Sequence, residues 1–145
     1  MRIAIASDHA GFKYKEMVKD FLEKRGHETA DFGTDSTERC DYPDFIGPAA
    51  GAVSNMEAGA GIVFGGSGNG EAMAANKIKG IRCAVCWNTE SAKLAKTHNN
   101  ANMISIGERM VEEKDLLNIV ETWLVNEFEA GRHVARLEKL HALEK

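Results

Sequence analysis

The sequence predicts an α/β protein in which helices cover both faces of a parallel sheet. Short strand-like runs alternate with segments of helical periodicity along the whole chain, which is typical of a three-layer α/β/α sandwich. Four glycines within residues 65–70 join one apolar run to a helix. The chain has 145 residues and 43% hydrophobic composition, enough for one core. We therefore expect a single Rossmann-like domain over residues 1–145, with five parallel strands in the order 2-1-3-4-5.

The first half of the chain supplies two strands and two helices. The first strand is expected at residues 2–7. Apolar residues then recur at helical spacing up to a stop at Gly26; they are Tyr14, Met17, Val18, Phe21 and Leu22. A second strand at 28–32 leads into a polar loop over 33–41. Tyr42 and Pro43 open the next helix, because proline is tolerated in a first turn.

The second half continues the alternation. We expect strands at 61–64, 81–86 and 103–106, with helices at 71–78 and from Asn88 or Thr89 to Thr97. The following helix has a clear apolar face, made by Leu116, Leu117, Val120, Trp123 and Leu124. A last helix over 132–144 repeats apolar residues at coiled-coil-like spacing; they are Val134, Leu137, Leu140 and Leu143. This seam favours packing on a partner subunit.

Composition excludes several classes of protein. The net charge of −4, without a run of lysines or arginines, argues against nucleic acid or an anionic membrane as the main partner. No apolar stretch reaches the length of a membrane span and Met1 leads directly into a strand pattern, so we expect a cytoplasmic protein. Cys83 and Cys86 lie in an apolar run and are expected in the core rather than in a zinc or redox site. Cys40 has no assigned role.

The glycine turn has the chemistry of an anion site. Its glycines permit unusual backbone angles and leave peptide N–H groups accessible to a ligand; they are Gly65, Gly66, Gly68 and Gly70. Glu71 follows them as a carboxylate at the edge of the cradle. The alternative is a tight strand-to-helix connection, but four glycines exceed what that requires.

A crevice is expected at the carboxyl ends of the strands, where strand one lies beside strand three. Asp8 and His9 would then face the glycine loop, and the helix ending near His98 would line the same rim. The pattern lacks a glycine at position 71 for G-x-G-x-x-G, and Gly70-Glu71-Ala72 replaces the Gly-Lys-Ser/Thr of a phosphate loop. Dinucleotide binding is therefore only a second choice.

Six short motifs occur in order along the chain. They are Asp8-His9-Ala10-Gly11-Phe12, Asp41-Tyr42-Pro43, residues 65–71, Ala74-Ala75-Asn76-Lys77, His98-Asn99-Asn100-Ala101 and Gly131-Arg132-His133. Together they resemble the ribose-5-phosphate isomerase type B family, which also includes isomerases of galactose 6-phosphate and allose 6-phosphate. The resemblance implies an aldose–ketose isomerase that needs neither metal nor cofactor. It also implies a homodimer or dimer of dimers with active sites at the subunit interface.

The resemblance also implies roles for individual residues. One branch of the family has a catalytic cysteine where this chain has Gly65, so the chain resembles the branch whose base is the glutamate, here Glu71. Ser67 would stabilise the enediolate and His98 would open the sugar ring. The sugar would contact Asp8, His9, Tyr42, Gly66, Gly68, Asn69, Gly70 and Asn99. The phosphate would contact Arg109, Arg132, His133 and Arg136, together with His9.

Ordinary structural roles remain open for several of these residues. Asp8 could cap a helix, Ser67 could stabilise the turn, and His98 could interact with the last carbonyls of its helix. The pKa of Glu71 is subject to two opposed effects, because a helix N-terminus favours the anion and burial disfavours it.

Other functions also remain open. A non-catalytic phosphosugar or nucleotide-binding module is one, and an isomerase of six-carbon sugar phosphates is another. A metal-dependent hydrolase built from Asp8, His9, Asp41 and His98 is weaker, because no H-x-x-H spacing supports it.

Overall fold

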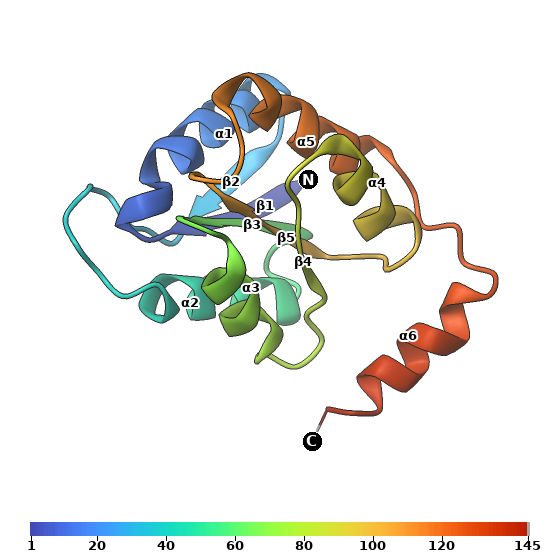
Figure 1. Ribbon diagram of the computed structural model, residues 1–145. Coiled ribbons are helices and arrows are strands. Elements are labelled where there is room, and N and C mark those ends of the chain that lie inside the picture. Colours follow the sequence, from blue (N-terminus) through green and yellow to red (C-terminus); the bar gives the residue numbers. More distant parts are fainter. Residues whose placement is uncertain (145) are drawn as a thin grey trace.

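The computed structural model describes residues 1–144 and places one sheet between two layers of helices (Figure 1). The strands are β1 (Arg2–Ser7), β2 (Glu28–Asp31), β3 (Ala60–Gly65), β4 (Cys83–Val85) and β5 (Met103–Gly107). The helices are α1 (Phe12–Lys24), α2 (Pro43–Ser54), α3 (Asn69–Asn76), α4 (Thr89–Thr97), α5 (Glu113–Val125) and α6 (His133–His141), and a 3-10 turn, η1 (His9–Gly11), precedes α1. The predicted three-layer α/β class is confirmed. Over residues 1–144, none of the helices has both the length and the apolar character of a membrane span.

The alternation of side chains in β1 shows how the sheet divides the interior into two cores. Ile3 and Ile5 pack in the core under α1, α4 and α5, whereas Ala4 and Ala6 face α2 and α3. All four side chains are fully buried. Cys83 and Cys86 are also buried, as predicted, and burial raises the pKa of the Cys86 thiol to about 12.

The predicted strand order is wrong at one edge of the sheet. All neighbouring strands are parallel, but their order is β2-β1-β3-β5-β4, so β5 lies between β3 and β4. Every residue of β5 is buried, whereas β4 has three residues of which Ala84 and Val85 are only half-buried. A fully buried apolar strand requires neighbours on both sides, and a short, half-exposed strand suits an edge. The predicted order β2-β1-β3 is correct, and these strands position the candidate site.

Helix α6 projects from the rest of the molecule (Figure 1). Its end is attached by a contact of 2.8 Å between Arg82 Nη1 and His141 Nε2, and by a hydrogen bond of 3.0 Å from the Gly80 N–H to Glu144. Its apolar residues are largely unburied: Val134 and Leu140 are 40% and 47% exposed, and Leu143, just beyond the helix, is 75% exposed. The predicted packing of this helix on a partner subunit stays a prediction.

Candidate active site

The loops after β1 and β3 lie against one another at the carboxyl edge of the sheet. Ser7 pairs with Phe64 in the parallel register of the two strands, and the Asp8 N–H donates to the Phe64 carbonyl at 3.4 Å. A β-carbon on Gly11 would collide with the backbone of Phe64 and Gly65, so only glycine permits this approach. The predicted juxtaposition of the Asp8 loop and the glycine loop is confirmed.

Asp8 is held at this junction by its own turn. Its Oδ1 accepts hydrogen bonds from the N–H groups of Ala10 at 2.9 Å and Gly11 at 3.2 Å. Asp8 therefore caps the 3-10 turn η1. The side chain is 8% exposed. Its negative charge acts on the Glu71 carboxyl and contributes to a raised pKa there.

The glycine loop is anchored by β5. Gly68 has a left-handed φ of 84° at the start of α3, a conformation that favours glycine. The hydroxyl of Ser105, in the middle of β5, donates to the Gly68 carbonyl at 2.7 Å. The N–H groups of Gly66 and Ser67 donate to no other group within residues 1–144. The loop is therefore held in place by β5, while the N–H groups of Gly66 and Ser67 remain available to a ligand.

Glu71 is the most unusual side chain at this edge. It is 4% exposed, and within residues 1–144 its buried Oε2 has no hydrogen-bond partner. Burial raises its pKa above the ordinary carboxyl value, the charge of Asp8 adds to this, and the N–H groups of Glu71 and Gly68 oppose it. Burial therefore outweighs the helix N-terminus, which answers the question left open by the sequence. A base of raised pKa is suited to proton transfer near neutral pH.

Gly65 explains how the carboxylate fits. The Glu71 carboxyl occupies the space that a β-carbon of residue 65 would need, because that atom would overlap the carboxyl carbon and both oxygens. A cysteine at position 65 and this conformation of Glu71 are mutually exclusive. The glycine is thus part of the arrangement that makes Glu71 the candidate base.

Gly65→Ala is expected to lower kcat by about 10²-fold or more, because the methyl group displaces the carboxyl from its position beside the free amides. Steady-state kinetics with ribose 5-phosphate, the substrate that the family resemblance implies, measures the loss, and circular dichroism checks folding. Gly47→Ala and Gly51→Ala are matched controls, since nothing lies within 4 Å of a β-carbon at either position in α2. Unchanged kcat in Gly65→Ala would contradict this account of the site.

Other predicted residues join the glycine loop. The Tyr42 ring lies against Gly70, where a β-carbon would be 2.7 Å from Tyr42 Cζ. The Arg109 guanidinium lies against Gly66, where a β-carbon would be 2.9 Å from Arg109 Nη1. The Ser67 hydroxyl accepts a hydrogen bond of 3.2 Å from the Asn69 N–H, so it stabilises the turn and its own proton is free for a ligand.

His9 has a neighbour that the sequence did not reveal. Its Nδ1 accepts a hydrogen bond of 3.2 Å from the Cys40 N–H, and the Cys40 Sγ lies 4.0 Å from the same nitrogen. Nothing in the polar loop over 33–41 indicated this contact.

The sequence-based predictions also missed Ser105, although a lone polar residue inside the buried run Met-Ile-Ser-Ile was a usable signal.

The remaining predicted residues lie at the amino edge of the sheet, opposite the glycine loop. The prediction that they line the same crevice as the glycine loop is therefore wrong within one chain. His98 directly follows α4, and the nearby Asn100 carbonyl accepts hydrogen bonds of 3.0 and 2.8 Å from Arg82, just before β4 begins. Glu71 instead follows the carboxyl end of β3. Six residues of strand separate the two edges by roughly 20 Å. The residues at the amino edge are His98, Asn99, Arg132, His133 and Arg136.

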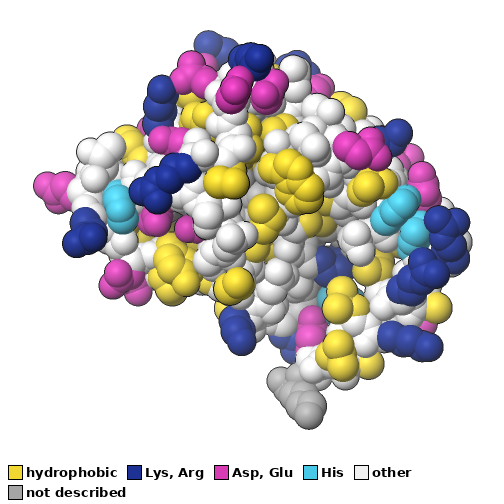
Figure 2. All heavy atoms as spheres, viewed as in Figure 1, with side chains coloured by type: hydrophobic (Ala, Val, Ile, Leu, Met, Phe, Trp, Pro, Cys, Tyr) yellow, Lys and Arg dark blue, Asp and Glu magenta, His cyan; other side chains and the backbone are white. Residues whose placement is uncertain are grey.

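This second group combines histidines with arginines. The rings of His98 and His133 stack with centroids 4.4 Å apart. His133 is 7% exposed, and its pKa is lowered by burial and then by the charges of His98, Arg132 and Arg136. Figure 2 shows histidine side chains at the surface beside a group of lysines and arginines on the side where α6 lies. Such a concentration of cationic groups suits a phosphate.

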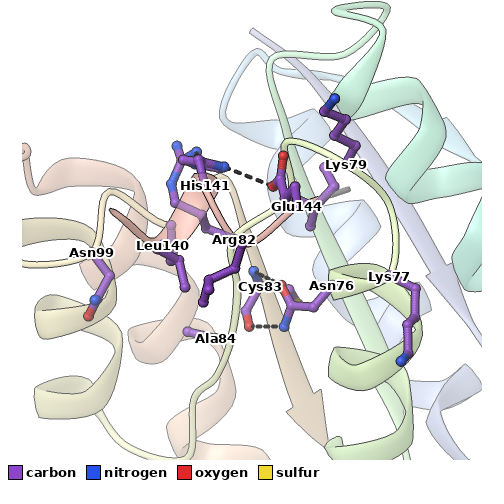
Figure 3. A pocket seen from close by; sticks show the side chains of 13 residues that line it. Asn76, Lys77, Lys79, Arg82, Cys83, Ala84, Asn99, Leu140, His141 and Glu144 are labelled. Carbon is purple, nitrogen blue, oxygen red and sulfur yellow. Dashed lines mark hydrogen bonds and ion pairs between the residues drawn. The ribbon is translucent and has the colours of Figure 1, made fainter. Parts of the chain in front are cut away.

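A cavity of about 500 Å³ lies between α6 and the segment leading into β4, away from the glycine loop. Figure 3 shows Arg82, His141 and Glu144 on one side and Asn76 on the other. The Asn76 amide exchanges two hydrogen bonds with the backbone of Cys83, at 2.9 and 2.8 Å. These contacts fasten the end of α3 to the edge of the sheet, while the contacts of Arg82 with His141 and of Gly80 with Glu144 fasten the end of α6. Glu71 does not line this cavity.

The fold and the site define an α/β protein suited to proton transfer on a small anionic molecule. The chain belongs to the Ribose/Galactose Isomerase family, whose model matches residues 3–140. It is 43% identical over 148 residues to "Ribose-5-phosphate isomerase B" of Mycolicibacterium paratuberculosis, covering 100% of this chain and 92% of that protein.

Solved structures show the same similarity. The ribose-5-phosphate isomerase B of Clostridium thermocellum superimposes with a TM-score of 0.98 at 48% identity, over 99% of this chain and 97% of that chain. The enzyme of Mycoplasma genitalium, solved with bound ribulose-5-phosphate, gives a TM-score of 0.94 at 36% identity, over 99% and 95% of the two chains. The predicted family resemblance is confirmed.

Proposed function

We propose that this chain interconverts ribose 5-phosphate and ribulose 5-phosphate through an enediolate. The observation that carries the proposal is the Glu71 carboxyl, which is buried, has a raised pKa and lies beside free peptide amides. The similarity to ribose-5-phosphate isomerases B, one of them solved with ribulose-5-phosphate, supports this substrate.

Glu71 acts as the base for both proton transfers. Its carboxylate removes the proton from C2 of the open-chain aldose, the C2–H electrons form the C1=C2 bond, and the carbonyl oxygen at C1 becomes an oxyanion. The proton of the C2 hydroxyl then moves to the C1 oxygen, which leaves the negative charge on O2. The O2 electrons form the C2 carbonyl, the electrons of the C1=C2 bond take the proton back from Glu71 at C1, and the carboxylate is regenerated. The amides of Gly66 and Ser67 and the Ser67 hydroxyl stabilise the oxyanion, because they are in place before charge develops.

Other residues hold the sugar. Asp8, Tyr42 and Asn69 bind sugar hydroxyls at the carboxyl edge, where Arg109 and His9 also reach the substrate. His98 opens the furanose ring, since an imidazole has one ring nitrogen that can donate a proton and one that can accept it. Asn99 binds a sugar hydroxyl, and Arg132, His133 and Arg136 bind the phosphate. These proton transfers call for neither a metal nor a nucleotide.

The active site is built from two chains. Glu71 and the α6 arginines are at opposite edges of the sheet, so a single chain cannot bring both groups to one pentose phosphate. A symmetric pair of chains can place the amino edge of one against the carboxyl edge of the other, which creates two equivalent sites. The exposed apolar residues Val134 and Leu140 of α6, with Leu143 just beyond its end, support this helix as part of the contact.

Initial rates with ribose 5-phosphate, allose 6-phosphate and galactose 6-phosphate test the proposed activity. The purified chain, with no metal or nucleotide added, is expected to show a kcat/KM for ribose 5-phosphate at least about tenfold above the other two. A higher kcat/KM for either hexose phosphate would identify that sugar as the preferred substrate. The proposed proton transfer by Glu71 would still hold. Binding of all three without turnover would instead identify a non-catalytic phosphosugar-binding module.

A further inference from the structure

Two histidines and one glutamate converge at the amino edge of the sheet. His98 follows α4, His133 begins α6, and Glu129 lies in the connection between α5 and α6. The Glu129 N–H donates to the Thr97 carbonyl at 3.0 Å, which fixes the glutamate beside His98. Three separate segments therefore hold this cluster, which we call the His98–Glu129–His133 cluster.

The ring nitrogens face one carboxylate oxygen across a gap that exceeds a hydrogen bond. Nε2 of His98 lies 3.7 Å from Glu129 Oε1, and Nε2 of His133 lies 4.0 Å from the same oxygen. All three candidate ligand atoms lie within 4.8 Å of one another. No hydrogen bond within residues 1–144 occupies either Nε2, so both nitrogens are available as ligands.

These separations approach those of ligands on a transition-metal ion, but the two stacked rings must turn out of their stack before both Nε2 lone pairs point at one ion. Three atoms spaced in this way share a point about 2.5 Å from each, whereas Zn–N and Zn–O bonds are about 2.0–2.2 Å long. Rotation of the stacked rings and of the exposed Glu129 side chain can supply the difference. His98 and Glu129 are 36% and 58% exposed, so an ion can reach the cluster from solvent.

We propose that the His98–Glu129–His133 cluster binds a divalent transition-metal ion of the zinc class and that the ion inhibits the enzyme. Two imidazoles and a carboxylate form a donor set suited to zinc, whereas magnesium and calcium prefer oxygen ligands alone. A fourth position stays open to water. The positive charges of Arg132 and Arg136 act on His133 and repel a cation. We therefore expect the ion to bind weakly enough to dissociate, as a regulatory ion does, rather than to be a permanent structural ion.

Inhibition follows from the identity of the ligands. An ion held by both imidazoles occupies a ring nitrogen of His98, which is assigned to ring opening, and a ring nitrogen of His133, which is assigned to the phosphate. Neither nitrogen can then contact the sugar phosphate. This consequence rests on the proposed function, but binding of the ion does not. Binding and inhibition can therefore be measured separately.

Calorimetric titration of the full-length, tag-free and chelator-stripped protein with Zn²⁺ tests binding. One Zn²⁺ per chain is expected, and Glu129→Gln and His98→Gln should each weaken it at least about tenfold. Glu127→Gln is the matched control, because Glu127 is an exposed carboxylate on the same connection. Cys40→Ala tests the competing pair formed by Cys40 and His9. Absence of binding, binding unchanged in Glu129→Gln, or binding lost in Cys40→Ala would overturn the site.

Kinetics then tests the consequence. Zn²⁺ should inhibit wild type and Glu127→Gln at the concentrations that fill the site, and Glu129→Gln should need at least about tenfold more, each compared with its own metal-free rate. Binding without inhibition would overturn the regulatory role alone. An inactive protein that still binds Zn²⁺ through Glu129 would contradict the proposed function but not the metal site.

Discussion

Glu71→Gln is expected to lower kcat for ribose 5-phosphate by about 10²–10⁴-fold, while the affinity for the sugar phosphate changes by less than about threefold. Glutamine preserves the size of the side chain and removes its ability to accept a proton from carbon. The buried carboxyl contributes the chemistry, whereas the amides and arginines that bind the substrate are unchanged. Steady-state kinetics gives kcat, and calorimetric titration with ribose 5-phosphate gives the affinity.

Glu90→Gln is the matched control for this experiment. Glu90 is also a glutamate in the first turn of a helix, but it is exposed at the start of α4. If the kinetic effect of Glu71 came only from helix stability, both substitutions would have similar small consequences. Near-normal turnover in Glu71→Gln would remove Glu71 from the role of base.

Mixing two inactive variants is expected to restore activity, because each active site takes one edge from each chain. Glu71→Gln disables the carboxyl edge, and the double variant Arg132→Ala/Arg136→Ala disables the amino edge, with an expected loss of about 10²-fold or more in kcat/KM. After subunit exchange at equal concentrations, half of the dimers are mixed and each has one intact site. Because only one of the two sites in these mixed dimers is intact, about a quarter of the wild-type rate should return.

The control for complementation pairs two lesions at the same edge. Glu71→Gln mixed with Gly65→Ala should stay inactive, because no combination of these chains yields an intact carboxyl edge. Native mass spectrometry shows whether mixed dimers form in each experiment. Mixed dimers without recovery in the first mixture, or full activity in a monomer, would contradict a site built from two chains.

The sequence predicted the layers and the first three strands because they depend on local periodicity and on the rule that ligands meet the carboxyl edge. The last two strands were reversed because both read as short apolar runs between helices. What separates them is burial on each side: β5 is buried at every residue, and β4 is half-exposed at Ala84 and Val85. Burial of a strand depends on which other strands and helices pack beside it, and this cannot be deduced from the residues of the strand alone.

The carboxyl-edge part of the candidate site was predictable for a similar reason. Glu71 and Ser67 lie at the glycine loop because the short connection after β3 fixes their positions. Tyr42 follows a long connection between β2 and α2, and only the family resemblance indicated its place at the site. His98 was misplaced because a helix between parallel strands runs back along the sheet and ends at the opposite edge. Glu129 gave no signal, since an isolated exposed glutamate in a connection has many ordinary uses.

Proton exchange with solvent tests the central claim most directly. Ribose 5-phosphate is incubated in D₂O with wild type or with Glu71→Gln, without added metal, and followed by proton NMR. Wild type should replace the C2 hydrogen of the aldose with deuterium and yield ribulose 5-phosphate that carries deuterium at C1, whereas Glu71→Gln should do neither at a comparable rate. Exchange by Glu71→Gln at the wild-type rate would contradict transfer of the proton by this carboxyl.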